Sequence, residues 1–379
     1  MIASSGPRSV LHLTDYGAPY EGNFIASLRA LERLLAEQGT GMTYVFPRRA
    51  ADRDWVKAMM REKDNVRCIE NDGFFAYARQ IRRLLRESGA EVLHAHFIHF
   101  SEKLAALYAC RTCGRRVRTV LHLHNHIELP KNALRHLPHR LYFRAVSRFV
   151  CCSRSVAEHL IADGVPRERV TVAENAIAFA RLDTFDPGVR AALHLPQNTK
   201  LALMFGYNYE VKGVDLAVEA VRLLRERTGA PVSLAVVLSS RLDEVRRRIC
   251  AQLSVSSLPD WVLLLPPRED VASYYHMADV FLSPSRQEGF CYALVEAAYC
   301  RTPVLASAID AQRDLALPQS AFFPPCDPAA LSAALERVLS EPDPPFFKDA
   351  LEETGRAVTD AYSLAHWART VADAYNAIL

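Results

Sequence analysis

The sequence lacks the features that mark several large classes of protein. It contains no run of roughly eighteen apolar residues, so we predict no transmembrane helix. Residues 1–10 lack the basic start and apolar stretch of a secretory signal, and a formal net charge of +3 does not indicate a nucleic-acid partner. The nine cysteines are an odd number scattered along the chain, which favours reduced thiols in the cytoplasm.

Common nucleotide-binding fingerprints are also missing. No Gly-x-Gly-x-x-Gly turn follows the strands predicted at 9–13 and 200–205, where a Rossmann dehydrogenase would carry it. The Gly-Lys-Ser/Thr sequence of P-loop proteins is absent as well. The sequence therefore disfavours both of these classes.

What the sequence does contain is a regular alternation of apolar runs and helical patterns. Half of its residues are hydrophobic, which is enough for two ordinary cores. The alternation is typical of parallel sheets covered by helices, so we predict an α/β fold of two doubly wound, Rossmann-like domains. The predicted strands are 9–13, 42–46, 66–69, 91–95, 119–123, 148–152, 170–173, 200–205, 232–238, 261–265, 280–282 and 303–306.

The domain boundary is predicted from a loss of this pattern. Residues 179–198 are rich in turn-forming residues and weakly periodic, which indicates a linker. We therefore predict an N-terminal domain at 1–178 and a C-terminal domain at 199–361.

The most informative stretch is Ser-Pro-Ser-Arg-Gln-Glu-Gly-Phe at 283–290. It joins an apolar strand to a helix predicted at 292–298. The backbone N–H groups of residues 290–292 would point out of the start of that helix, where the helix dipole favours a phosphate.

Two carboxylates flank this turn. Glu296 would lie roughly 9 Å along the helix at about 1.5 Å per residue, which is about the reach from a diphosphate to the ribose of a nucleotide. Glu288, on the loop, could accept hydrogen bonds from hydroxyls beyond the phosphates. The alternative is that Glu288 caps the helix and Glu296 lies on its solvent face.

The whole string carries a family resemblance. Pro-Ser-x-x-Glu-Gly-Phe, with Glu296 in register and Arg-Thr-Pro-Val at 301–304, resembles the Glu-x7-Glu signature of retaining GT-B glycosyltransferases, family 4 in particular. The resemblance implies two domains facing across a cleft and a final helix at 362–379 that crosses back to the first domain. It also implies a UDP- or GDP-linked sugar as the donor substrate, and no metal or other cofactor. The likeness spans nearly the whole chain but is sharp only at 283–304.

A second element follows the first strand of the C-terminal domain. Gly206 and Lys212, with the glycine after it, match the family's Gly-Arg…Lys-Gly element, and a lysine there could neutralise a leaving diphosphate. Tyr207 departs from the family, which has arginine at this place. Arg286 could supply the missing cation, or it is a surface arginine. The predicted donor-binding residues are Gly206, Asn208, Lys212, Arg286, Glu288, Gly289, Phe290, Cys291 and Glu296.

The N-terminal domain offers a loop and two histidine clusters. The loop that carries Gly17, Tyr20, Glu21 and Gly22 looks like the family's glycine-bearing loop on the acceptor side, or it is a plain βα turn. His96 resembles the last histidine of the family's Asp-x-x-His-x-His strand ending and is predicted on the same side.

His124 matches best the family histidine that faces the donor sugar. His122 and His126 alternate with it and could share its face while the chain is extended, although a histidine at a strand end is often structural. The catalytic residues implied by the resemblance are His124, Lys212 and Glu288.

Two other features give weaker predictions. Cys110 and Cys113 precede the second histidine cluster, but one cysteine pair is weak evidence for zinc and the resembling family needs no metal, so we predict none. The stretch 131–148 mixes cations with Leu, Tyr and Phe, which would suit peripheral contact with the inner face of an anionic membrane. Pro138 is predicted to interrupt its helix, and a basic solvated face is the alternative.

The resemblance thus predicts a retaining glycosyltransferase that moves a sugar to a hydroxyl of a glycan, a lipid-linked or a small-molecule acceptor. Tyr207 in the arginine place, and Ala176 where the family has glycine, leave open a catalytically weak or inactive binding or regulatory partner. A sugar-nucleotide epimerase is a further alternative.

Overall fold

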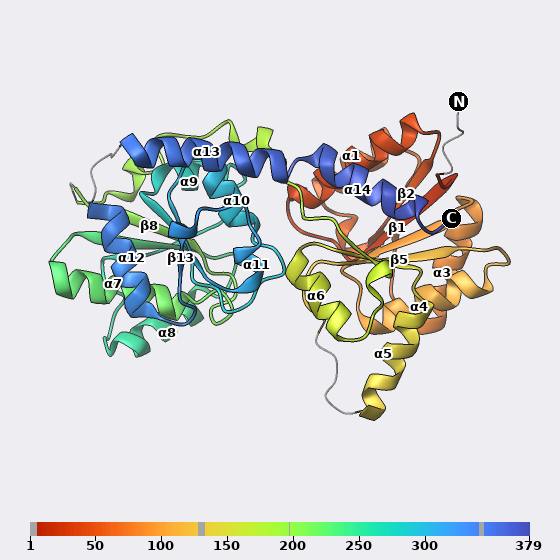
Figure 1. Cartoon of the computed structure of the whole chain (residues 1–379), viewed down its shortest axis with the longest axis horizontal. Helices are drawn as coiled ribbons and strands as arrows, with labels where there is room; N and C mark the ends of the chain where they lie inside the picture. Colours follow the sequence, from red (N-terminus) through yellow and green to blue (C-terminus); the bar gives the residue numbers. More distant parts are fainter. Residues whose placement is uncertain (1–5, 128–132, 197, 341–344) are drawn as a thin grey trace. The chain divides into compact units, whose positions relative to one another are not determined.

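The continuous apolar runs become the strands of two parallel sheets, because strands that helices cover on both faces are buried on both sides. The structure, a computed structural model, describes residues 6–127, 133–196, 198–340 and 345–379. It divides into two units, Met1–Ala176 with Leu364–Leu379, and Ile177–Ser363 (Figure 1). The predicted α/β class, with two Rossmann-like domains, is confirmed.

The first unit contains a seven-stranded parallel sheet in the order β3-β2-β1-β4-β5-β6-β7. Its strands are β1 (Ser9–Thr14), β2 (Gly41–Pro47), β3 (Val66–Ile69), β4 (Val92–His96), β5 (Arg118–Leu123), β6 (Arg148–Cys151) and β7 (Val170–Val172). Its helices are α1 (Gly22–Glu37), α2 (Asp54–Glu62), α3 (Phe74–Glu87), α4 (Phe100–Thr112), α5 (Ala133–Ala145), α6 (Arg154–Ala162) and α14 (Leu364–Asn376), with 3-10 turns η1 (Arg48–Ala50) and η2 (Arg167–Arg169).

The second unit contains a six-stranded parallel sheet in the order β10-β9-β8-β11-β12-β13. Its strands are β8 (Lys200–Phe205), β9 (Val232–Val237), β10 (Val262–Leu265), β11 (Val280–Ser283), β12 (Val304–Ser307) and β13 (Phe322–Phe323). Its helices are α7 (Val214–Thr228), α8 (Leu242–Leu253), α9 (Ala272–Met277), α10 (Tyr292–Tyr299), α11 (Asp310–Arg313), α12 (Pro328–Ser340) and α13 (Pro345–Ala361), with 3-10 turns η3 (Phe179–Leu182), η4 (Ala191–Leu193) and η5 (Gln319–Ala321).

Both sheets reverse their strand order at one point. In the first sheet the reversal lies between β1 and β4, and in the second it lies between β8 and β11. The loops that leave the carboxyl ends of such strands diverge and leave room for a ligand. The loops that carry the predicted site residues follow these four strands and β5.

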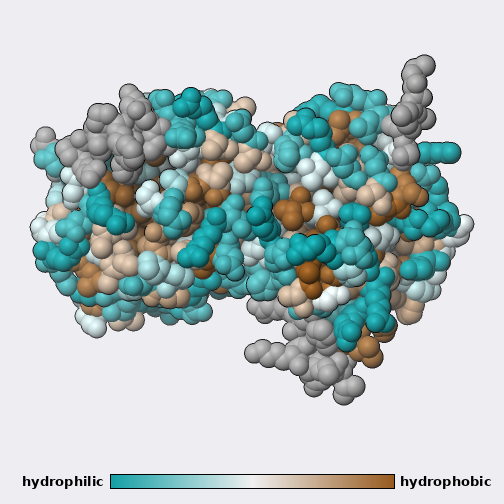
Figure 2. All heavy atoms as spheres, in the orientation of Figure 1, coloured by the Kyte–Doolittle hydropathy of each residue, from teal (hydrophilic) through white to brown (hydrophobic). Residues whose placement is uncertain are grey.

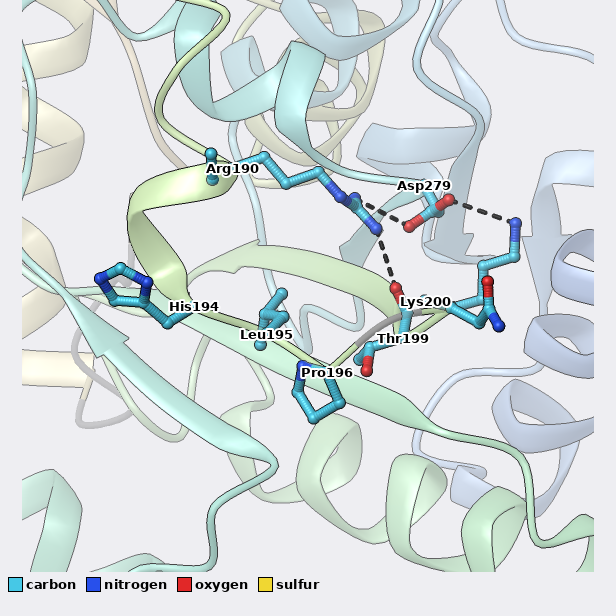
Figure 3. A pocket seen from close by; sticks show the side chains of 9 residues that line it. Arg190, His194, Leu195, Pro196, Thr199, Lys200 and Asp279 are labelled. Atoms are coloured by element: carbon cyan, nitrogen blue, oxygen red, sulfur yellow. Dashed lines mark hydrogen bonds and ion pairs between the residues drawn. The ribbon is translucent and has the colours of Figure 1, made fainter.

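The predicted linker 179–198 is part of the second unit in the structure. Arg190 donates to the carboxylate of Asp279 at 3.0 Å and to the carbonyl of Thr199 at 2.8 Å, and Lys200 pairs with the same carboxylate at 3.4 Å (Figure 3). A cavity of about 410 Å³ lies beside these residues, at the amino end of β8. The segment is irregular but it is anchored, because its cations find partners on the unit that follows.

The last helix belongs to the first unit. Trp367 and Tyr375 of α14 are buried in the core of that unit, where α14 packs against α1. The chain passes from one unit to the other at 176/177 and 363/364, whereas the sequence placed the boundaries at 178 and 361. Ile177 donates its N–H to the carbonyl of Tyr362 at 2.9 Å, so the two crossings lie side by side.

Helix α5 carries most of the segment predicted to contact a membrane. Lys131 lies outside the described residues, as do the side chains of 133–136. The helix continues through Pro138, contrary to the prediction, since a proline removes one hydrogen bond without ending every helix. None of the helices in the described part combines the length and the apolar character that a bilayer crossing demands.

Candidate functional site in the second unit and a histidine cluster in the first

Two loops of the second unit meet where its sheet reverses. The loop after β8 ends at Gly213, which has a φ of +66° and lies so close to Pro284 that an added Cβ would be 2.1 Å from the proline carbonyl oxygen. The backbone N–H of Arg286 donates to the carbonyl of Val211 at 2.8 Å. Only glycine combines this φ with this close approach, so Gly213 allows the two loops to touch.

This contact brings two predicted residues together. Lys212 donates to a carboxylate oxygen of Glu288 at 2.6 Å, and Ser285 donates its hydroxyl to the same oxygen at 2.7 Å. The side chains of Lys212 and Glu288 are 11% and 8% exposed. The ring of Tyr207 lies 4.6 Å from the ammonium group.

Lys212 keeps its charge despite this burial. Desolvation alone would lower the pKa of Lys212, but the negative charge of Glu288 and the neighbouring Cys291 and Tyr207 outweigh it and raise the pKa above its ordinary value. A buried, charged lysine therefore lies where the second sheet reverses its strand order.

Glu296 lies on α10 and is buried, so it is not on the solvent face. One of its oxygens pairs with Arg181 and the other accepts the hydroxyl hydrogen of Tyr275 at 2.8 Å. A cavity of about 150 Å³ lies at the start of α10. Four of the predicted donor-binding residues line this cavity: Lys212, Phe290, Cys291 and Glu296.

Three other predicted donor-binding residues have structural roles here. Arg286 forms a bidentate pair with Asp215 at 2.8 and 2.6 Å, and it does not line the cavity, so its proposed compensation for the missing arginine is not supported. Asn208 accepts the N–H of Val211 at 3.3 Å and so shapes the loop. An added Cβ at Gly206 would lie 2.6 Å from a methyl carbon of Val236, so this glycine makes room for the core. Gly289 is buried on the loop after β11.

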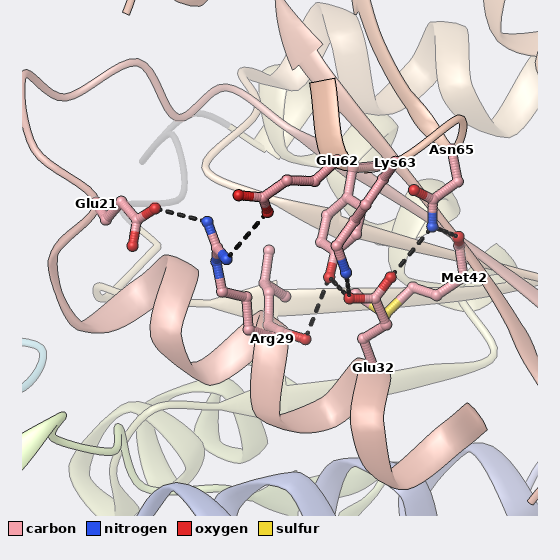
Figure 4. A network of polar contacts seen from close by, with 9 residues as sticks. Glu21, Arg29, Glu32, Met42, Glu62, Lys63 and Asn65 are labelled. Carbon is pink, nitrogen blue, oxygen red and sulfur yellow. Dashed lines mark hydrogen bonds and ion pairs between the residues drawn. The ribbon is translucent and has the colours of Figure 1, made fainter. Parts of the chain in front are cut away.

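The acceptor-side loop of the first unit is held mainly by side chains that follow it in the sequence. Glu21 pairs with Arg29 of α1 at 2.7 Å, and Arg29 also reaches Glu62 at 3.8 Å (Figure 4). Gly22 has a φ of +59° and begins α1, which fits the plain βα turn that the sequence left open. Tyr20 remains exposed. The carbonyl of Gly17 accepts a hydrogen bond from Arg53 at 3.1 Å.

Five histidines gather at the carboxyl end of the first sheet. His12 of β1 pairs in register with His94 of β4, and His96 pairs in register with His122 of β5. Because these residues alternate along neighbouring strands, their rings share one face of the sheet. His124 follows β5 and stacks on His122 at 4.4 Å.

The structure separates this cluster from the other residues that the sequence considered. His126 contacts Ser155 at 3.5 Å and lies beyond the end of β5, so it does not join His122 and His124. Cys113 donates its thiol to the carbonyl of Cys110 at 3.2 Å. Within the described ranges, the groups of side chains close enough to share a metal consist of histidines alone.

The sequence gave no role to two members of the cluster, His12 and Tyr375. The hydroxyl of Tyr375 lies 2.6 Å from Nδ1 of His94 and 3.2 Å from Nε2 of His12. The position of His12 at the end of a predicted strand could have indicated that it lies beside the other histidines. Tyr375 lies far away in the sequence, and no local pattern indicates its contact with them.

The cluster is neutral at physiological pH. Desolvation lowers the pKa of His12 and of His122 to about 3, and the charge of a protonated His122 contributes to the lowering of the pKa of His12. Desolvation also lowers the pKa of His94, His96 and His124 well below its ordinary value. Both ring nitrogens of His122 are buried without a hydrogen-bond partner in the described part of the chain.

Comparisons with known proteins agree on one family. The family model described as "Glycosyltransferase Family 4" matches residues 27–181, and the one described as "Glycosyl transferases group 1" matches residues 187–357. A D-inositol 3-phosphate glycosyltransferase of Xylanimonas cellulosilytica is 33% identical over 46% of this chain and 43% of its own length. One of Geodermatophilus obscurus is 29% identical over 58% of this chain and 48% of its own. The chain thus spans about half the length of these curated relatives.

Solved structures share the fold across nearly the whole chain. A glycosyltransferase of Rickettsia africae has a TM-score of 0.80 at 16% identity and covers 98% of both chains. The Anabaena protein Alr3699/HepE, solved in complex with UDP-glucose, has a TM-score of 0.75 at 15% identity and covers 96% of this chain and 98% of its own. At these identities the likeness concerns the fold.

The close approach of the two loops predicts unequal effects of two glycine substitutions. Gly213→Ala should lower the free energy of unfolding by roughly 2–4 kcal/mol, because the new Cβ adds a clash with Pro284 to the strain of a positive φ. Gly229→Ala is the matched control. Gly213 precedes α7 and Gly229 follows it, also with a positive φ, of +68°, but no atom lies within 4 Å of a Cβ added at Gly229. It should lose only about 1–2 kcal/mol in urea unfolding. Equal losses would contradict the role given to Gly213.

The buried histidines predict a loss of stability in mild acid. Their folded pKa values lie below the unfolded value of about 6.5, so the unfolded state binds more protons and stability falls as the pH drops from about 6.5 toward about 3. His122→Phe removes one titrating group and two unpaired nitrogens. The free energy of unfolding of this variant should therefore fall less steeply in that window, by about 1.4 kcal/mol per pH unit. Urea unfolding at about pH 7.5 and about pH 5.5 measures this difference. The exposed His366→Phe is the control, and an identical slope in both variants would sink the prediction.

Proposed function

Because the chain belongs to the GT-B glycosyltransferases of family 4, we propose that it transfers a hexose from a nucleoside diphosphate sugar to an acceptor hydroxyl, with retention at the anomeric carbon and without a metal. The observation that carries this proposal is the buried pair of Lys212 and Glu288 beside the start of α10. A cation and a helix start at one place suit a diphosphate, and the adjoining carboxylate suits sugar hydroxyls.

The chemistry assigns a distinct task to each side chain. The bond from the anomeric carbon to the phosphate oxygen breaks, the bond to the acceptor oxygen forms on the same face, and the acceptor proton passes to the leaving diphosphate. Lys212 stabilises the charge that develops on the diphosphate. Glu288 accepts hydrogen bonds from the transferred sugar, Glu296 accepts them from the ribose, and His124 donates to a substrate oxygen. No protein base is required.

The comparisons suggest which substrates to test first. Alr3699/HepE is solved with UDP-glucose, which supports a UDP-linked sugar before a GDP-linked one. The curated relatives are named for D-inositol 3-phosphate, which supports a phosphorylated polyol as a first acceptor. Both assignments are proposals for this chain.

A peripheral membrane contact of a cytoplasmic enzyme is part of the proposal. The exposed Leu137 and Leu141 of α5 alternate along the helix with the exposed Arg140 and Arg144. Figure 2 shows apolar and polar residues intermixed over one face of the molecule. Apolar side chains next to cations suit an anionic lipid surface. This combination supports a lipid-linked acceptor as the second class to test.

A non-catalytic binding partner is the second candidate function. Two observations favour it. Tyr207 stands where the family has arginine, and Arg286, which could have replaced that arginine, is paired with Asp215, so the site has one cation fewer than in the family. Incubation with a panel of nucleotide sugars, with and without acceptors, separates the candidates. Transfer or donor hydrolysis supports the enzyme, binding without turnover supports the partner, and an isomerised sugar nucleotide would indicate an epimerase.

Removing the buried cation should be far more harmful than removing an exposed one. Lys212→Met should lower kcat on the order of 10²–10³-fold, the usual effect of losing one group that stabilises charge in the transition state. Lys200→Met removes the same charge from an exposed lysine at the amino end of β8, the strand that precedes the Lys212 loop, and should leave kcat unchanged. Steady-state kinetics with the best donor of the panel gives the comparison. Equal activity in the two variants would refute the role of Lys212.

The two carboxylates should differ in what they control. Glu288→Gln should reduce turnover more than affinity for the free nucleoside diphosphate, because Glu288 faces the transferred sugar. Glu296→Gln should mainly weaken nucleotide binding, as measured by calorimetry. Wild-type turnover and affinity in both variants would remove these roles.

A further inference from the structure

Four histidines and one tyrosine of the first unit form a continuous chain of hydrogen bonds. Nδ1 of His94 lies 2.6 Å from the hydroxyl of Tyr375, which lies 3.2 Å from Nε2 of His12. Nδ1 of His12 lies 3.1 Å from Nε2 of His96, and Nδ1 of His96 lies 3.2 Å from Nε2 of His124. We call these five residues the histidine chain.

The contacts within the chain run from ring edge to ring edge. The centroids of His12 and His96 are 5.3 Å apart although their nearest nitrogens are 3.1 Å apart, and the corresponding values for His96 and His124 are 5.5 and 3.2 Å. Rings stacked face to face would have their centroids closer together. The nitrogens therefore meet as donor and acceptor.

The hydrogen bonds along the histidine chain must all be donated in the same direction. A neutral imidazole has one N–H donor and one bare nitrogen, and a tyrosine hydroxyl has one donor and two acceptor lone pairs. His12 and His96 each use both ring nitrogens in the histidine chain, so each donates on one side and accepts on the other. If Tyr375 accepted from both His94 and His12, its own proton would be buried without an acceptor among the described residues, so Tyr375 also donates on one side and accepts on the other. Burial raises the pKa of Tyr375 well above its ordinary value, so its hydroxyl keeps its proton. Only two arrangements are then possible.

The buried end of the chain decides between the two arrangements. If the protons pointed toward His94, that residue would accept at Nδ1 and carry its proton on Nε2. Nε2 of His94 is buried and has no partner in the part of the chain that the structure describes. A buried N–H without an acceptor is rarer and more costly than a bare acceptor. The protons therefore point toward His124, and all four histidines carry the proton on Nδ1.

We infer that Tyr375, His94, His12 and His96 are positioning residues that hold His124 in the Nδ1–H tautomer, so that His124 can donate but not accept a hydrogen bond at its remaining ring nitrogen. Nε2 of His124 accepts from His96, which leaves Nδ1 for a ligand. The use of this donor toward a substrate oxygen rests on the proposed function. The tautomer itself does not, because it follows from the hydrogen bonds of the free protein.

A metal site is the rival explanation for so many buried histidines. His96, His122 and His124 have ligand atoms within 4.8 Å of one another, as do His12, His94 and His96. However, the rings of His122 and His124 are stacked at 4.4 Å and 6°, and an imidazole binds a metal through a lone pair in its own ring plane. Parallel stacked rings do not aim at a common ion. The rings of His94 and His96 also contact at 4.1 Å, so hydrogen bonding accounts for the cluster better.

The direct test is nitrogen-15 NMR of the wild-type protein labelled at histidine. Ring nitrogen shifts and their couplings to the ring carbons distinguish the two neutral tautomers. We expect His12, His94, His96 and His124 to be neutral and protonated on Nδ1 at neutral pH. A proton on Nε2 of His124, or a stoichiometric transition metal in elemental analysis of the purified protein, would overturn the inference. This measurement requires no variant to fold.

Removal of one hydroxyl then tests the anchor. Tyr375→Phe breaks the chain at its buried end, so His124 should become a mixture of both tautomers. If His124 acts on substrate, kcat should fall roughly 10- to 100-fold, by analogy with the loss of a partner that orients a metal-bound histidine. Tyr44→Phe is the matched control, because Tyr44 is a buried tyrosine of the same unit whose hydroxyl donates to Glu32 at 3.0 Å. It should change neither the tautomer nor kcat.

The outcomes separate this inference from the proposed function. A fixed Nδ1–H tautomer without any sugar transfer would contradict only the proposed function. Sugar transfer by a protein whose His124 populates both tautomers, or a Tyr375→Phe variant with an unchanged tautomer, would contradict only the inference.

Discussion

The second unit depends on the close approach of Gly213 to the carbonyl of Pro284. This contact joins the loops after β8 and β11 and brings Lys212 to 2.6 Å from Glu288. Burial of two charges costs several kcal/mol per ion, and apolar residues of similar volume often stabilise a fold as well or better. Stability alone therefore gives little reason to keep this ion pair where the sheet reverses its strand order, and the proposed function supplies one.

The two units place different chemistry at equivalent positions of similar sheets. In the second unit the loops after the central strands carry two cations, Lys212 and Arg286, and each of these is paired with a carboxylate. In the first unit they are neutral imidazoles, which burial keeps uncharged. Neutral rings fix the direction of hydrogen bonds, whereas ion pairs fix charge. The fold is common to both units, and the function of each is set by the side chains on its loops and strand ends.

The sequence predicted most of the fold because the strands are continuous apolar runs. The predicted strands agree with the structure to within about one residue at each end, since burial on both faces leaves little choice of residue type. The strand at Phe322–Phe323 was missed because two residues carry no periodicity. The sequence also singled out Lys212, Glu288 and Glu296 from short motifs beside glycines and strand ends, and the structure pairs Lys212 with Glu288 and places Lys212 and Glu296 at one cavity. Their binding roles stay predictions.

The sequence missed contacts whose partner lies far away along the chain. Arg286 was considered as a phosphate ligand or a surface arginine, and its pairing with Asp215 was not predicted because that contact leaves no local pattern. The turn-rich segment was taken for a linker because the ion pair of Arg181 with Glu296 is equally invisible in the sequence. Tyr375 meets its histidines only through the packing of α14 on the first unit. Tertiary contacts, rather than local propensity, decide the role of each of these residues.

The same pairings limit how the second unit can hold a diphosphate. Arg181 is matched by Glu296, Arg286 by Asp215 and Lys212 by Glu288. A diphosphate bound here would therefore meet these three cations already paired, and the start of α10 would offer it unpaired positive charge. Under the proposed function, sugar hydroxyls that draw Glu288 away would leave Lys212 free to face the phosphates. Recognition of the sugar and neutralisation of the leaving group would then be one event, because both depend on the same carboxylate.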